Sequence, residues 1–95
     1  MLVALFASCN KQERPLTAAE LLDLGEKYLL EMNYEQAIVC FERLIEVEPR
    51  NPRGYTGAAE AYVGLGDYSS AISILKLGAE RVTRNTYLRD AAKIY

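Results

Sequence analysis

The chain has 95 residues, of which 51% are apolar and 25% charged, with a formal net charge of −2. This composition is typical of one small domain, and the scattered lysines and arginines exclude the basic stripe that nucleic-acid binding requires. Histidine is absent, and the two cysteines lack zinc-ligand or CxxC spacing, so we expect no metal, no cofactor and no nucleic-acid partner.

The first residues differ in composition from the rest of the chain. Met1–Ala7 reads MLVALFA, an unbroken apolar run, and the charged stretch KQERP follows shortly after it. A run of seven is far shorter than the roughly 20 residues that cross a bilayer as a helix, but it matches the lower limit of a secretory signal's apolar region. We therefore predict that residues 1–15 form a signal segment and a tether.

The residues FASC at Phe6–Cys9 resemble a bacterial lipobox, in which small residues precede a cysteine that receives a diacylglyceryl group. The resemblance implies lipidation of Cys9 and a membrane-anchored lipoprotein outside the cytoplasm, in the bacterial cell envelope. Two features depart from that pattern, because Phe6 stands where leucine is usual and no basic residue precedes the apolar run. A truncated membrane anchor and a plain apolar tail stay open as alternatives, and with them a cytoplasmic location.

The first predicted helix begins after Thr17. The sequence TAAE is a capping box, in which the Thr17 hydroxyl and the Glu20 carboxylate each accept a backbone N–H of the other residue. Met32–Asn33 is the predicted turn at its end. The apolar residues of this helix recur at helical spacing and form one face: Leu21, Leu24, Gly25 and Tyr28.

The second predicted helix ends at Pro49, which excludes the α conformation for Glu48. Its apolar stripe consists of Ala37, Phe41, Leu44 and Ile45. Cys40 lies beside this stripe, and we predict a buried and unreactive thiol there.

Asn51 is the predicted cap of a third helix, with Pro52 at its first position, where a missing N–H costs nothing. This helix presents Tyr55, Ala58, Ala59 and Tyr62, and breaks at the sequence GLGD. Asp67 then caps a fourth helix, which carries Ala71, Leu75 and Ala79 and runs to about Val82. Asn85 is the predicted cap of a fifth helix, TYLRDAAKIY.

The chain repeats itself, since YEQAI at Tyr34 returns as YSSAI at Tyr68. Paired helices at a period of about 34 residues, with the pattern L-G-x-x-Y, A-x-x-x-F and P, resemble the tetratricopeptide repeat family. The residues that carry the pattern are Leu24, Gly25, Tyr28, Ala37, Phe41 and Pro49. The resemblance implies an all-α array of helical hairpins, an α-α superhelix, over residues 16–95. We assign repeat one to 18–51, repeat two to 52–85, and a C-terminal capping or truncated helix to 86–95.

The second repeat departs from the pattern at several positions. Ala58 and Ala59 replace the Leu-Gly pair, Leu75 replaces phenylalanine, and Gly78 and Thr83 stand where a larger residue and a proline are expected. Glycine within a helix costs about 1 kcal/mol relative to alanine, so a glycine such as Gly25 needs a compensating role. We expect that it allows the two helices of a hairpin to cross closely. We predict that the repeated tyrosines fill the wider spaces of the core.

No catalytic set of residues can be assembled from this sequence, and the usual general base, histidine, is missing. The family resemblance implies instead a non-catalytic scaffold that holds a peptide or protein in the concave wall formed by the first helices. Carried over residue by residue, the wall consists of Leu22, Glu26, Leu29, Arg53, Thr56, Glu60 and Val63. Glu26 and Glu60 favour a partner with lysine or arginine, and the lysines and asparagines with which some relatives clamp a carboxylate are missing. The alternative is a fragment of a longer array, or the non-catalytic part of a larger enzyme or assembly factor.

Overall fold

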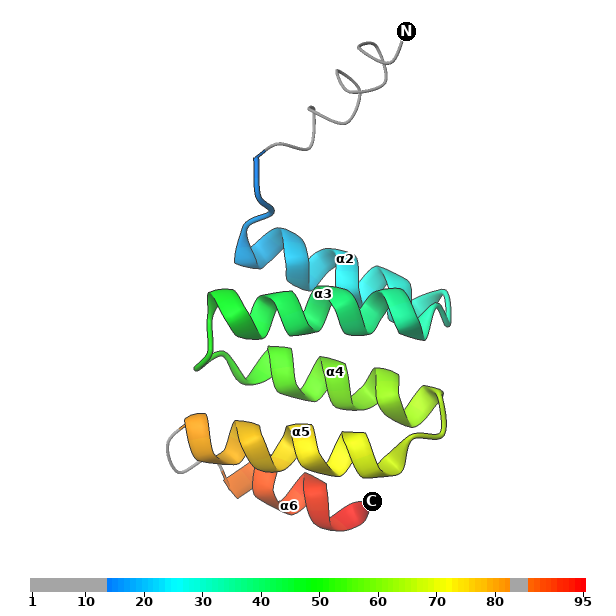
Figure 1. Cartoon of the computed structure of the whole chain (residues 1–95), viewed down its shortest axis with the longest axis vertical. Coiled ribbons are helices and arrows are strands. Elements are labelled where there is room, and N and C mark those ends of the chain that lie inside the picture. Colours follow the sequence, from blue (N-terminus) through cyan, green and yellow to red (C-terminus); the bar gives the residue numbers. More distant parts are fainter. Residues whose placement is uncertain (1–13, 83–85) are drawn as a thin grey trace, which may run out of the picture.

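The structure of the protein, a computed structural model, describes residues 14–82 and 86–95, without the side chains of residues 86 and 87. Cys9 and most of the predicted signal segment, as well as the predicted cap Asn85, lie outside the described residues. Five helices and no strand form the part that is described, which confirms the all-α prediction (Figure 1). They are α2 (Ala18–Leu30), α3 (Tyr34–Val47), α4 (Pro52–Gly64), α5 (Tyr68–Arg81) and α6 (Thr86–Ile94).

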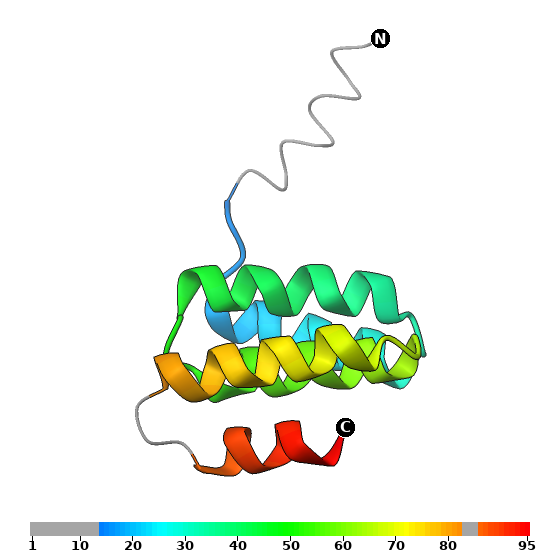
Figure 2. The same ribbon diagram turned by 60° about the horizontal axis from the view of Figure 1, so that its bottom comes forward.

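The helices stack in chain order, and each runs antiparallel to the one before it (Figures 1 and 2). Each helix contacts the next, and α2 also contacts α4. The first helices of the two hairpins are therefore neighbours, as a helical-hairpin array requires. Along residues 14–82 and 86–95, no helix combines the length and the apolar character that a membrane crossing needs.

Local hydrogen bonds fix the helix starts where the sequence predicts them. The Glu20 N–H donates to Thr17 Oγ1 at 3.1 Å, and the Thr17 N–H donates to Glu20 Oε1 at 2.9 Å, which confirms the capping box. The Asn51 side chain accepts from the Arg53 N–H at 3.0 Å, and the Asp67 side chain accepts from the Ser70 N–H at 3.1 Å. These bonds satisfy N–H groups that have no partner within the helix.

The turn inside each hairpin has a residue in the left-handed backbone conformation at the same position, although the amino acid differs between the repeats. Met32 has a φ of 59°, and Gly66, at the equivalent position of the second repeat, has a φ of 79°. Glycine adopts this conformation without strain, whereas methionine does so at a cost. Helix α4 ends one residue later than predicted, because it includes Gly64, the first residue of GLGD. The Leu65 N–H still donates to the Ala61 carbonyl at 3.2 Å.

The core of the first hairpin is organised around the ring of Phe41, which is 1% exposed. A Cβ added at Gly25 of α2 would lie 2.8 Å from Phe41 Cζ, and one added at Gly57 of α4 would lie within 2.5 Å of three ring atoms. One aromatic ring on α3 thus contacts the bare backbone of both flanking helices. Leu21, Ala37, Leu44, Ala58 and Ala61 complete this cluster.

The core of the second hairpin has its large and small side chains at different positions from those of the first. Leu75 stands where the first has Phe41, and its cluster contains Ala59 and, partly buried, Ala91, at the positions of Gly25 and Gly57. Its largest side chain is Tyr55, which is fully buried where the first hairpin has Leu21. A Cβ at Gly78, which replaces Leu44, would lie 2.6 Å from Tyr55 Cγ. The apparent degeneracy of the second repeat is therefore a compensated repacking.

The prediction that the repeated tyrosines fill the core is wrong for one of them. Tyr28, Tyr34 and Tyr62 are half-buried, but Tyr68 is 51% exposed. The Tyr68 ring lies beside α6 and stacks on Tyr95, with the ring centroids 6.4 Å apart. Its partner is thus a second exposed ring rather than the backbone of a neighbouring helix.

We expect Gly57→Ala to destabilise the fold through the Phe41 ring. Overpacking costs about 1–3 kcal/mol, from which about 1 kcal/mol of helix propensity is recovered. In the Phe41→Leu background the added methyl gains room, so the same substitution should cost less, with a coupling of about 1 kcal/mol or more. Urea denaturation of the wild type, both single variants and the double variant measures this coupling. Additive effects would contradict the proposed contact.

We also expect the Thr17 cap to weaken in acid. The Arg14 side chain, whose nitrogens donate to the Glu20 carboxylate at 2.9 and 3.1 Å, and then the Thr17 N–H lower the pKa of Glu20 from 4.5 to about 2. Because the folded-state pKa is lowered, this stabilisation is present above about pH 4.5 and is lost as the pH falls toward 2. Glu20→Gln should flatten the decline in unfolding free energy over that window. The exposed Glu46→Gln serves as control, and equal pH slopes in wild type and Glu20→Gln would contradict the assignment.

Candidate functional site

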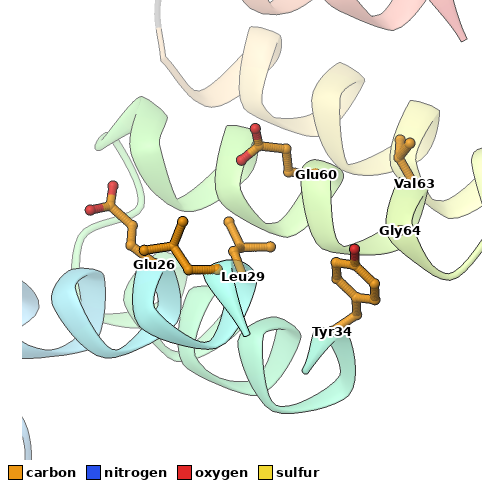
Figure 3. Close-up of a pocket in the computed structure, with 7 residues that line it drawn as sticks. Glu26, Leu29, Tyr34, Glu60, Val63 and Gly64 are labelled. Carbon is orange, nitrogen blue, oxygen red and sulfur yellow. The ribbon is translucent and has the colours of Figure 1, made fainter. Parts of the chain in front are cut away.

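A groove lies between α2 and α4, on the wall that the first helices of the two hairpins form (Figure 3). Its volume is about 600 Å³. The last two turns of α2, the first residue of α3 and the last two turns of α4 supply its lining. These residues are Glu26, Leu29, Leu30, Tyr34, Glu60, Val63 and Gly64.

Most of the residues predicted for the concave wall line this groove or the hollow next to it. Glu26, Leu29, Glu60 and Val63 lie in the groove. The adjacent hollow, of about 310 Å³, lies between α4 and α6, and its lining includes Arg53, Thr56, Ala59, Glu60, Ala91 and Tyr95. Glu60 belongs to both, so the two concavities adjoin at this residue of α4.

Leu22 differs from the other predicted wall residues. It is half-buried and packs against the cluster around Phe41, and it lines neither the groove nor the adjacent hollow. The structure therefore gives Leu22 a packing role. Its assignment as a peptide contact stays a prediction.

The sequence analysis missed Tyr34, which closes one end of the groove. A Cβ at Gly64 would lie within 2.6 Å of Tyr34 Cε1, Cζ and Cδ1. The ring can therefore lie against the last turn of α4 only because residue 64 has no side chain. The one available signal was an aromatic residue at the start of one helix, Tyr34, combined with a glycine at the end of the following helix, Gly64.

The electrostatics of the groove are set by two glutamates and one arginine. Arg53 Nη2 on α4 donates to Glu26 Oε2 on α2, and the side chains are 55% and 43% exposed. Within the described residues Glu60 makes no ion pair. An exposed ion pair contributes at most about 1 kcal/mol to stability, so the Arg53–Glu26 contact matters more for the charge of the groove than for the fold.

The remaining perturbed groups have structural explanations. Burial raises the pKa of Tyr62 to about 12, with a smaller contribution from the hydrogen bond that its hydroxyl donates to Glu42 at 2.8 Å. The same hydrogen bond joins α4 to α3. Cys40 is 6% exposed, which confirms that it is buried, and burial raises the pKa of its thiol. In the described part of the chain, no three histidine, cysteine, aspartate or glutamate residues gather into a metal site.

Comparison with known proteins places this geometry in a family. The family model described as tetratricopeptide repeat matches residues 28–93, which begins in the last turn of α2, covers α3, α4 and α5, and reaches into α6. The human small glutamine-rich tetratricopeptide repeat-containing protein beta is 38% identical over 55 residues, 58% of this chain. The matched segment is 18% of that protein, so the chain spans about a fifth of its relative. With the helical array, the internal repeat and this match, the chain belongs to the tetratricopeptide repeat family.

Proposed function

We propose that the protein is a non-catalytic interaction scaffold, which holds a peptide or a segment of a protein partner in the groove between α2 and α4. The observation that carries this proposal is the apolar lining left open to solvent at one end of the groove. Leu30 is 85% exposed there, and Leu29, Tyr34 and Val63 are half-buried. Exposed apolar side chains gathered in a concavity and rimmed by charges are typical of a protein-binding surface.

The chemistry of the groove supports binding over catalysis. Its polar groups are two carboxylates and a tyrosine hydroxyl, and its lining contains no serine, cysteine, lysine or histidine that could act as a nucleophile beside a base. The family itself consists of helical-hairpin arrays, whose stacked first helices form a continuous wall. A binding role thus follows from the same helices that the core requires.

We further propose that Cys9 carries a lipid, which would tether the domain to a bacterial membrane outside the cytoplasm. The support is the sequence FASC after an apolar run, which lies outside the described residues. Arg14 and Pro15 lead directly to the Thr17 cap, so a lipid at Cys9 would leave a short tether before α2. A lipid of two or more acyl chains contributes about 0.8 kcal/mol per buried methylene and would anchor the domain durably.

A second candidate is that the chain is a fragment of a longer repeat array, or the non-catalytic repeat portion of a larger enzyme or assembly factor. The observation that favours it is the human relative, of which the matched segment forms only 18%. Reading the genomic DNA on both sides of the coding region decides this candidate. Further coding sequence in frame supports it, and stop codons in frame on both sides contradict it.

Selection from a displayed random-peptide library tests the groove. We expect wild-type protein to enrich peptides whose binding falls at least tenfold in Val63→Glu, because a carboxylate is then placed in the apolar end of the groove. Val47→Glu is the matched control, since Val47 is 51% exposed at the end of α3 and lines neither concavity. Selected peptides that bind both variants as well as wild type would refute the groove as the binding surface.

Fractionation of bacterial cells that express the full chain tests the lipid. We expect the parent protein in the membrane fraction and labelled by an alkyne fatty acid, and Cys9→Ser unlabelled and released from the membrane. Cys40→Ser controls for the loss of a thiol and should keep the label. If Cys9→Ser stays membrane-bound and labelled like the parent, lipidation at Cys9 is ruled out.

A further inference from the structure

The groove between α2 and α4 has two ends of different chemistry. Leu29 and Leu30 of α2, with Val63 of α4 and the Tyr34 ring, form an apolar end. Glu26 and Glu60 lie about one turn nearer the starts of the same two helices. In Figure 3 the Tyr34 ring and Val63 lie together at one end, and the two carboxylates lie toward the other. A ligand along the groove therefore meets an apolar site and then an acidic one.

Within the described residues, only one of the two carboxylates has an ion-pair partner. Glu26 accepts a hydrogen bond from Arg53, so its charge is compensated within the protein. The repeat offers no equivalent partner to Glu60. The displacement that carries Glu26 onto Glu60 carries Arg53 onto Tyr87, a residue without a positive charge.

The charges around Glu60 do not change this asymmetry. Arg53 is the only basic residue of α4, and its guanidinium is already committed to Glu26. On α6, the Lys93 ammonium lies 3.8 Å from Asp90, and within the described residues Arg89 makes no ion pair. Glu60 is exposed and shared by the groove and the adjacent hollow, so a cation brought by a ligand can reach it from either concavity.

We infer that the groove selects an extended segment of a protein partner in which one lysine or arginine pairs with Glu60 while a nearby apolar side chain fills the Leu29–Tyr34–Val63 end. The inference rests on the proposed function and specifies its ligand. Glu60 and Val63 are three residues apart, about 4.5 Å along the helix axis. In an extended chain, the nearest side chains on one face are two residues and about 6.6 Å apart, which is the same-face spacing closest to this distance, so we expect one residue between the basic and the apolar position.

The test compares random-peptide selections on the full chain as wild type, Glu60→Gln, Glu60→Lys and the exposed control Glu46→Gln. The wild-type and control pools should be enriched in lysine or arginine two residues from an apolar residue. Individual wild-type peptides should bind Glu60→Gln about two- to fivefold more weakly, the contribution of an exposed ion pair. The Glu60→Lys pool should be enriched in aspartate or glutamate at the same position, because the charge of the site is reversed.

Arg53→Gln provides an independent variant, since it releases Glu26 while the groove's apolar end is unchanged. Its pool should gain a second basic residue, and a pool with one basic residue as in wild type would overturn the role assigned to Arg53. Equal basic enrichment in the wild-type and Glu60→Gln pools would overturn the inference while leaving the groove as a binding surface. A failure of the proposed function is distinguishable, because no selected peptide would then respond to Val63→Glu.

Discussion

The structure depends on one aromatic ring that touches two helices where neither has a side chain. Phe41 on α3 lies against Gly25 of α2 and Gly57 of α4, and it is almost completely buried. Burial of a phenylalanine contributes about 1.5–3 kcal/mol, and two bare backbones let that ring bring three helices together. In the second hairpin the smaller Leu75 occurs with alanines at both corresponding positions, Ala59 and Ala91. Between the repeats, a larger side chain on the second helix thus occurs with smaller residues on the two flanking helices.

The same close packing creates the groove. Because α3 lies tightly against both α2 and α4, these two first helices become neighbours, and their faces turned away from α3 form a wall. The short distance between α2 and α4 allows Arg53 to reach Glu26, and the absence of a side chain at Gly64 allows Tyr34 to close one end. The shape and charge of the groove are therefore direct results of core packing.

The helices and their starts could be predicted from the sequence because the signals are local. The caps at Thr17, Asn51 and Asp67 depend on residues within three positions, and the internal repeat fixes the order of the hairpins. The contacts that define the groove are not local. Tyr34 and Gly64 belong to different repeats, and no helical periodicity relates them. Predicting such a contact requires the distance between the helices, which the packing of the core determines.

The contact between Phe41 and Gly57 crosses the boundary between the two repeats, at residues 51 and 52. A genetic exchange that inserted a whole foreign hairpin at that boundary would place a foreign helix against this ring in the position of α4 and Gly57. A crossover within the hairpin turn at Met32–Asn33 would keep the ring with Gly57 but would separate it from Gly25, which it also contacts. The exchangeable unit around this ring is accordingly the three consecutive helices α2, α3 and α4 rather than one hairpin.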